Sequence, residues 1–277
     1  MNRRLFAGIF FALAVIAGCG PTAETPRPEP APTLVSREEL YRAGHQLYLE
    51  SQYDSAAALL RRAYKMDTSV VEPVRDLAQL HYEWAMRAPE KSRERTQRLR
   101  TARTYFVRLD ALGERTSDVY ERLCEISVSL DDGRSFMRYA RKNAELYPYD
   151  RQLFNLARAY FEVEDFQNVI KSTKESIDRF KGSPYITSYY RLLGRAYMKI
   201  GRDQTAEKTL AAGVKEAEAR LAALRTQGAG EGTDQWRRAH DDKINMLLAL
   251  KQLHTTYRAD DKLGRVEQQL KEEGYGK

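Results

Sequence analysis

The feature that most constrains the fold of this chain is a pair of small residues, twelve positions apart, that recurs along the sequence. Gly44 is followed by Ala56, and Gly194 is followed by Ala206, each within an apolar pattern of helical spacing. A small residue on each of two successive helices lets the helices cross closely, and a bulky residue four positions later seals the contact. The body of the chain is therefore predicted to consist of closely packed helix pairs.

The same pattern of first-helix positions can be followed along the sequence between these two pairs. Equivalent first-helix positions, separated by 34, 46, 34 and 36 residues, are Gly44, Ala78, Cys124, Arg158 and Gly194. The interval of 46 implies twelve extra residues around Pro89, and the interval of 36 implies two extra residues in the turn at 182–184. Arg158 replaces a small first-helix residue, and Phe136 and Ile170 replace small second-helix residues, so the register of the third and fourth repeats is the least constrained.

Two segments resemble the tetratricopeptide repeat at its signature spacings. The first carries Leu40, Ala43, Gly44, Leu47, Ala56, Leu60, Ala63 and Thr68, and the second carries Tyr190, Leu193, Gly194, Tyr197, Ala206, Leu210 and Gly213. The resemblance implies an all-α, right-handed superhelix, or α-solenoid, of about five helix–turn–helix repeats over 36–225. The expected repeats lie near 37–70, 71–116, 117–150, 151–186 and 187–225. After a Gly-rich loop at 226–234, helices within 235–273 are expected to cap the last exposed apolar face, which a solenoid requires.

The N-terminus has the ordered parts of a secretory signal peptide. A short basic segment at 2–4 precedes an apolar run from Leu5 to Ala17, which is shorter than the roughly 20 residues of a membrane-spanning helix. The small residues before Cys19 resemble the lipobox of bacterial lipoproteins. This resemblance implies that residues 1–18 are removed and that Cys19 carries the lipid, palmitate included. The alternative is an ordinary signal peptide with a chance cysteine.

Residues 19–35 are rich in proline and have no apolar periodicity. Such a segment extends by about 3.1 Å per residue, so it could hold the folded body roughly 50 Å from the lipid. A Pro-rich docking motif is the alternative to a tether. In two-membrane bacteria an aspartate after the lipidated cysteine favours the inner membrane. Gly20 at this position therefore implies the periplasmic face of the outer membrane.

No pattern in the sequence indicates catalysis, a cofactor or a metal. His240 and His254 would lie about 21 Å apart along one helix, too far to share one metal, and the other histidines fall on separate helices. The acidic pairs at 131–132 and 241–242 are sequence neighbours, which point to different faces of a helix. No strand precedes the glycines of 226–234, so they do not form a phosphate-binding loop. We expect a non-catalytic chain in which Cys124 is a buried, inert thiol.

The resemblance also implies a concave binding groove lined by the first helix of each repeat. The groove positions are Tyr41, His45 and Tyr48 in the first repeat, Arg75, Gln79 and Tyr82 in the second, Glu121 and Glu125 in the third, Asn155 and Glu162 in the fourth, and Arg191, Arg195 and Met198 in the fifth. Arg191 and Arg195 are four residues apart on one helix, close enough to hold a carboxylate between them by charge-assisted hydrogen bonds. A solvated helix face is the alternative for this pair, and internal packing is the alternative for the tyrosines.

A second candidate surface is a basic run across the insertion of the second repeat. Its members are Arg93, Arg95, Arg98, Arg100 and Arg103, flanked by Lys91 and Arg108. Each basic residue near an anionic lipid surface contributes about 1 kcal/mol of attraction, so the run could contact lipid head groups. A solvated helix face is the alternative. Export of the chain argues against nucleic acid as the partner.

Together these patterns predict a lipid-anchored scaffold that binds other cell-envelope proteins through its concave face. Its expected function is in the assembly of an outer-membrane, secretion or pilus complex. Two other functions stay open. The chain could bind a peptide or small ligand in the periplasm, or it could be an accessory regulator of a cell-wall enzyme. The sequence does not indicate the oligomeric state.

Overall fold

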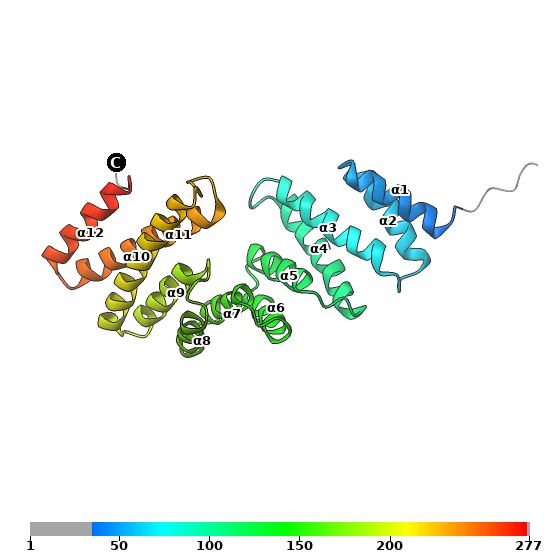
Figure 1. Ribbon diagram of the computed structural model, residues 1–277. Coiled ribbons are helices and arrows are strands. Elements are labelled where there is room, and N and C mark those ends of the chain that lie inside the picture. The colour runs from blue at the N-terminus through cyan, green and yellow to red at the C-terminus, as the bar shows by residue number, and fades with distance from the viewer. Residues whose placement is uncertain (1–34, 276–277) are drawn as a thin grey trace, which may run out of the picture. The chain divides into compact units, whose positions relative to one another are not determined.

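The computed structural model describes residues 35–275, and this part of the chain is built from helices without a strand (Figure 1). The helices are α1 (Arg37–Leu49), α2 (Tyr53–Met66), α3 (Val71–Arg87), α4 (Arg93–Ala111), α5 (Ser117–Ser129), α6 (Gly133–Leu146), α7 (Asp150–Glu162), α8 (Phe166–Arg179), α9 (Ile186–Lys199), α10 (Asp203–Thr226), α11 (Asp234–Thr256) and α12 (Asp260–Glu272). The predicted signal peptide at 1–18, Cys19 and the tether up to residue 34 lie outside the described residues.

Between Arg37 and the C-terminal helix, each helix packs against the next one in the chain. The odd-numbered helices are the first members of successive pairs, and contacts of α1 with α3, of α7 with α9 and of α9 with α11 join these first helices directly. Packing restricted to neighbours along the chain is the defining property of a solenoid. The predicted all-α solenoid is therefore confirmed.

The turns within the pairs repeat one geometry. Residues with positive φ occupy the same place in five of them, namely Ser51, Asp131, Glu164, Gly201 and Arg258. In each turn the N–H of the following residue donates to a carbonyl five residues earlier, as Gln52 does to Leu47 and Ala259 does to His254, both at 2.9 Å. This is the 6→1 hydrogen bond of a Schellman helix end. Because α11 and α12 share it, the C-terminal pair has the turn of a sixth repeat.

These turns also correct the predicted register of the fourth repeat. Glu164 follows Asp131 by 33 residues, so the residue equivalent to Cys124 is Ala157 and the prediction of Arg158 is wrong by one position. Ala157 is completely buried, whereas Arg158 is half-buried. On α8 the equivalent of Ala56 is likewise Val169, which is completely buried, and not Ile170. The fourth repeat thus keeps the small first-helix residue that the sequence interpretation had missed.

The twelve extra residues of the second repeat lengthen its helices. α3 and α4 contain 17 and 19 residues, against 13 and 14 in α1 and α2. Pro89 lies in the short turn between them, where its missing N–H removes no helical hydrogen bond. The insertion therefore extends the packed surface of this pair and does not form a long loop.

The glycines that led to the prediction lie at close helix contacts. A Cβ atom at position 44 would stand 2.9 Å from Leu60 Cγ, and one at position 194 would stand 2.5 Å from Leu210 Cδ2. Each leucine lies four residues after the small residue of its second helix. Glycine on the first helix and leucine on the second therefore form the expected sealed contact.

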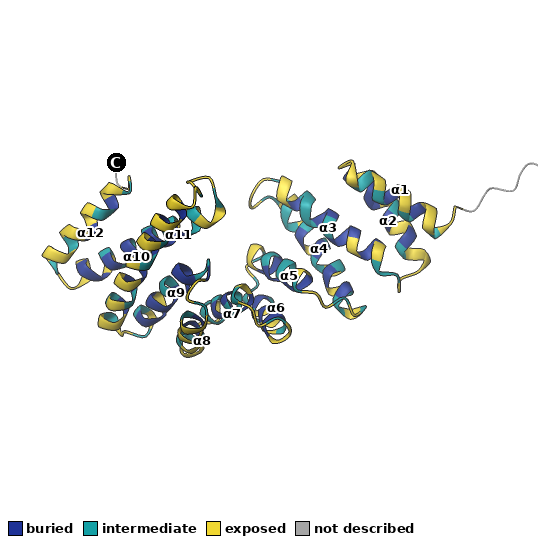
Figure 2. Cartoon of the chain, viewed as in Figure 1, coloured by how far each residue is buried: buried dark blue, intermediate teal, exposed yellow. Residues whose placement is uncertain are grey.

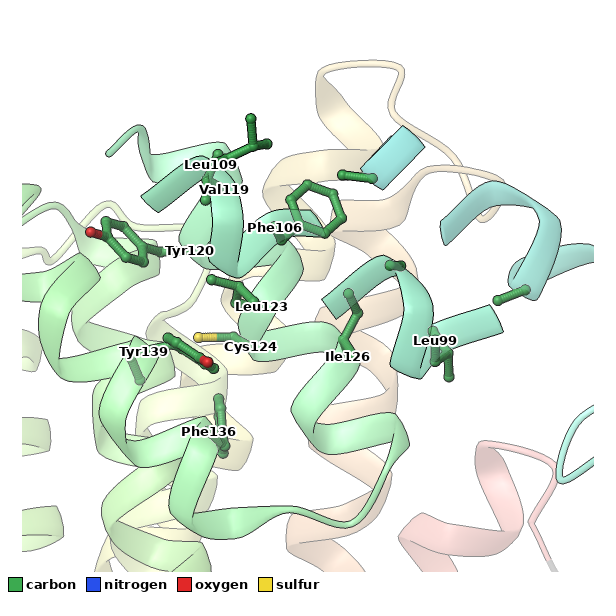
Figure 3. Packing of buried hydrophobic residues seen from close by; sticks show 14 of the residues in the cluster. Leu99, Phe106, Leu109, Val119, Tyr120, Leu123, Cys124, Ile126, Phe136 and Tyr139 are labelled. Carbon is green, nitrogen blue, oxygen red and sulfur yellow. The ribbon is translucent and has the colours of Figure 1, made fainter. Parts of the chain in front are cut away.

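The buried residues follow the faces along which neighbouring helices meet (Figure 2). One large cluster joins α3, α4, α5 and α6, and Figure 3 shows Cys124 within it among Leu123, Phe136 and Tyr139. Burial raises the pKa of the Cys124 thiol to about 12, and nearby Glu121 and Glu125 add to the effect. The thiol is therefore protonated and inert at neutral pH.

The C-terminal helices cover the last pair of the solenoid. Met246 and Leu250 of α11 pack into the same core as Leu210 of α10, and Val266 and Leu270 of α12 close this core. Lys243 is buried and pairs with Glu218 at 3.1 Å and with Glu273 at 2.6 Å. Within residues 35–275 we find no helix of the length and apolarity that a membrane span requires.

Candidate functional site

Three cavities are lined mainly by side chains of first helices. The N-terminal cavity, of about 560 Å³, takes its lining from α1, α3, α5 and α7, with contributions from α4 and the loop that follows it. The central cavity, of about 570 Å³, lies among α7, α9 and α11. The C-terminal cavity, of about 540 Å³, lies between α9 and α11, and Arg191, Arg195 and Asn245 line both of these last two cavities. These three cavities therefore lie on the first helices, whereas a further cavity, of about 640 Å³, is lined by Tyr64 of α2 and by residues of α4, which are second helices.

Predicted groove residues meet in these cavities, although they come from separate repeats. Tyr48, Arg75, Gln79 and Glu121 line the N-terminal cavity, and Arg191, Arg195, Glu162 and Met198 line the other two. Tyr41, His45, Tyr82, Glu125 and Asn155 lie on the same first helices but are not part of these linings.

Charges in the N-terminal cavity are paired within the second repeat and between the third and fourth repeats. Arg75 donates to both carboxylate oxygens of Glu114, at 2.8 and 2.9 Å, and this contact raises the pKa of the Arg75 guanidinium. Arg151 of α7 pairs with Glu121 of α5 at 2.9 Å. Bidentate and charge-assisted contacts of this kind fix side-chain orientation. The cationic groups of this cavity are therefore already engaged.

Glu83 of α3 organises the aromatic end of the groove. Its carboxylate accepts hydrogen bonds from Tyr48 at 2.8 Å, Gln79 at 3.0 Å and Tyr53 at 3.3 Å. Burial and the hydrogen bond to Glu83 raise the pKa of Tyr48. The sequence interpretation selected Tyr48 and Gln79 but missed Glu83, which lies one helical turn after Gln79 on the same face.

Two further carboxylates hold predicted groove residues from the adjacent helix. His45 Nδ1 lies 2.7 Å from Asp76 Oδ2, and burial raises the pKa of Asp76 even though His45 opposes this shift. Tyr82 donates to Glu125 at 2.8 Å, and Arg122 donates to the same oxygen at 2.7 Å. Tyr48 and Tyr82 are thus fixed by hydrogen bonds, whereas Tyr41 packs against the ring of His45, with 5.7 Å between the ring centres.

Asp242 of α11 holds Arg191 in place. The buried carboxylate accepts from Arg191 Nε at 2.6 Å and from the hydroxyls of Thr187 and Ser188 at 2.8 and 2.5 Å. In the sequence, Asp242 stood out only as the neighbour of Asp241, and two adjacent acids on a helix do not form a catalytic pair. Nothing local indicated that Asp242 would face α9, 51 residues away along the chain.

Arg195 and Arg158 contact aromatic rings, whereas Arg191 is paired with a carboxylate. The Arg195 guanidinium lies 4.7 Å from the ring centre of Phe161, and that of Arg158 lies 5.7 and 5.9 Å from the rings of Phe136 and Phe154. Within residues 35–275 neither arginine has a carboxylate at ion-pair distance. Burial, followed by repulsion from Arg191, lowers the pKa of both arginines.

The arginines of the predicted basic surface on α4 contact several different partners. Arg98 stacks on Trp84, with its guanidinium carbon 3.2 Å from the ring centre, and Arg103 pairs with Asp132 at 2.9 Å. Arg95 donates to the Ala88 carbonyl at 3.4 Å, whereas Arg93 and Arg100 are exposed. Contact of this surface with lipid stays a prediction. Over the described range we find no cluster of three side chains suited to hold a metal ion.

Comparisons with known proteins agree with this architecture. No family model and no curated protein sequence matches the chain. The crystal structure of YrrB, described as a TPR protein with an unusual peptide-binding site, is similar with a TM-score of 0.53 and 13% identity, over 69% of this chain and 91% of that one.

Two structures of MamA are also similar. One has a TM-score of 0.53 and 16% identity, over 67% of this chain and 94% of that one. The other, MamA from Desulfovibrio magneticus RS-1, has a TM-score of 0.50 and 16% identity, over 66% of this chain and 97% of that one. At these identities the similarity establishes the fold.

Proposed function

We propose that this chain, which has the tetratricopeptide-repeat solenoid fold, is a non-catalytic adaptor of the bacterial cell envelope. In this proposal Cys19 carries the lipid that attaches the chain to the periplasmic face of the outer membrane. Residues 20–35 act as the tether. The first helices then bind partner proteins and bring them to an outer-membrane, secretion or pilus assembly.

One observation carries the proposal. The three cavities lie on the first helices, and side chains from up to five helices converge in each. Such a surface suits an extended segment or a partner helix, because the stacked repeats present successive side chains along one line. The peptide-binding site named for YrrB supports this use of the fold.

Lipid attachment is tested by replacing each of the two cysteines of the chain. We expect Cys19→Ala to abolish incorporation of labelled palmitate and to release the protein from the membrane fraction. Cys124→Ala is the matched control, because Cys124 is buried in the helical body and is expected to leave labelling unchanged. Labelling that persists in Cys19→Ala would refute the anchor.

Partner binding is tested by crosslinking in membranes, followed by affinity isolation of the native protein and identification of what is attached. Recovery of β-barrel, pilus or secretion components would support the adaptor. Recovery of a cell-wall hydrolase or synthase would favour the regulator of a cell-wall enzyme. Isolation of the protein without any attached protein would contradict the adaptor and favour a small ligand.

A further inference from the structure

The two ends of the groove differ in whether their cationic side chains form ion pairs with carboxylates. In the N-terminal cavity the arginines pair with acids, as Arg75 of α3 does with Glu114 of the loop after α4, and Arg151 of α7 does with Glu121 of α5. Around α9, by contrast, Arg158, Arg195 and Lys199 have no ion pair within the described part of the chain. The C-terminal half of the groove therefore contains cations that the fold itself does not neutralise.

These cations are ordered along one line. Arg191, Arg195 and Lys199 are four residues apart on α9, so their Cα atoms lie about 6 Å from one another along the helix axis. Arg191 and Arg195 line both the central and the C-terminal cavity, which therefore meet at these two side chains. Lys199 is exposed, and Arg195 is exposed in part, with its guanidinium against the Phe161 ring, whereas Arg191 is already held by Asp242.

Carboxylates are also present in the linings, but several are occupied. Asp242 binds Arg191, Asp234 binds Arg237, and Asp203 accepts from the Tyr257 hydroxyl. Glu162 and Asp241 are exposed and unpaired among residues 35–275. The charge of Glu162 opposes the lowering of the pKa of Arg158 and Arg195, but among residues 35–275 Glu162 is not at ion-pair distance from either arginine.

Apolar side chains lie beside the cations in a lining that also contains Asn245, Gln252 and Thr256. Met198 of α9 and Leu248 and Ala249 of α11 line the C-terminal cavity together with Arg195 and Lys199. A ligand that matches both features has negative groups about 6 Å apart on the face turned to Arg195 and Lys199, and apolar groups on the opposite face, turned to Leu248 and Ala249 of α11. An extended polypeptide with acidic residues at alternate positions has this pattern, because its side chains on one face repeat every 6.6–6.8 Å, as estimated from roughly 3.3–3.4 Å per residue.

We propose that the groove formed by α7, α9 and α11 binds an acidic segment of a partner protein, with Arg195 and Lys199 as its exposed carboxylate-binding residues. Arg158 adds positive charge at the central cavity. This inference rests on the adaptor function proposed above and specifies the chemistry of the segment that the adaptor recognises.

The test uses the full chain with Cys19→Ala in detergent and a short fluorescent peptide that alternates glutamate and leucine. Binding is measured by fluorescence anisotropy at low and high salt, and a peptide with glutamine in place of glutamate is the ligand control. We expect the double variant Arg195→Glu with Lys199→Glu to bind the acidic peptide about tenfold more weakly or worse, since two charge-assisted contacts are reversed. Added salt should weaken binding by the unaltered groove.

Lys208→Glu with Lys215→Glu is the matched control for net charge. Both lysines are exposed on α10, a second helix, and lie outside the linings of the central and C-terminal cavities. This variant should bind the acidic peptide as the unaltered groove does. Circular dichroism of both double variants should show unchanged helicity, so that weaker binding reports the groove and not the fold.

Three outcomes would overturn the inference. These are equal binding of the glutamine peptide, equal weakening by both double variants, or no binding of the acidic peptide by the unaltered groove. A fourth is binding to vesicles of phosphatidylglycerol and phosphatidylcholine without binding to the peptide, which would assign the cations to a lipid surface. The adaptor function is judged separately, since it is contradicted only when native isolation recovers no protein partner.

Discussion

Gly194 of α9 and Leu210 of α10 lie in direct contact, so that a Cβ atom at position 194 would stand 2.5 Å from Leu210 Cδ2 and 2.6 Å from Cγ. Leu210 is completely buried and cannot move away without disturbing its core. The glycine is therefore required by the distance between two helices and not by backbone conformation.

Gly194→Ala should lower the free energy of unfolding by about 1–2 kcal/mol, because strain in a packed core exceeds the gain in helix propensity. Gly264 of α12 is the matched control, since a Cβ there would meet no atom within 4 Å. Gly264→Ala should stabilise the protein by about 0.5–1 kcal/mol. Denaturant unfolding of both variants measures the difference, and an equal response to both changes would contradict the close contact.

Asp242→Ala should destabilise the protein by about 3 kcal/mol, because it leaves Arg191 and two hydroxyls without their buried acceptor. Asp242 is only 3% exposed, whereas the adjacent Asp241 is exposed. Asp241→Ala should therefore stay within about 0.5 kcal/mol of the original stability. Thermal or denaturant unfolding distinguishes the two, and similar stabilities would remove Asp242 as the link between α9 and α11.

The pH dependence of stability should include a contribution from His81. This side chain is 2% exposed and stacks between Trp84 and Tyr105, and both ring nitrogens lack a hydrogen-bond partner. Burial, with the charges of Arg98 and Arg61, lowers the pKa of His81 to about 4. Between pH 6.5 and 4 the unfolded chain thus binds the proton more readily, and stability falls as the pH falls.

His81→Phe removes this titration and keeps an aromatic ring in the stack. The difference in unfolding free energy between the original protein and the variant should change by up to about 3 kcal/mol from pH 7 to pH 4, with the original protein losing more. Urea unfolding across this range measures the difference. Parallel curves for the two proteins would show that His81 does not titrate in this way.

The corrected register of the fourth repeat predicts opposite tolerance at two neighbouring positions. Ala157→Leu should destabilise the protein by about 1–3 kcal/mol, because the added methyl groups enter a completely filled helix contact. Arg158→Leu should cost less, since the half-buried side chain at 158 lies beside cavity space. A larger loss at 158 than at 157 would restore the register predicted from sequence.

The fold could be predicted because its main signal is local. Gly44 and Ala56, and again Gly194 and Ala206, sit at fixed offsets within single helix pairs, so their spacing is visible in the sequence. The fourth repeat was misplaced by one residue because Ala157 and Arg158 are adjacent and the preceding repeat is 33 residues long. A one-residue change in repeat length leaves little trace in an apolar pattern.

The contacts of the groove could be predicted only in part. Positions such as Arg75 and Arg191 follow from the repeat phase, but their partners Glu114 and Asp242 lie 39 and 51 residues further along the chain. Which acid faces which base depends on how the helices and loops pack against each other, and no local spacing encodes this packing. The contrast between paired and unpaired arginines therefore emerged from the structure alone.

The most direct test of the adaptor is site-specific photocrosslinking in living cells from two exposed positions. A photoreactive amino acid at Asn245, which lines the central and C-terminal cavities, is compared with one at Lys208 on the second helix α10. The account predicts discrete protein adducts from position 245 and none of the same species from position 208. Absence of adducts from position 245, or identical adducts from both positions, would contradict a partner-binding groove on the first helices.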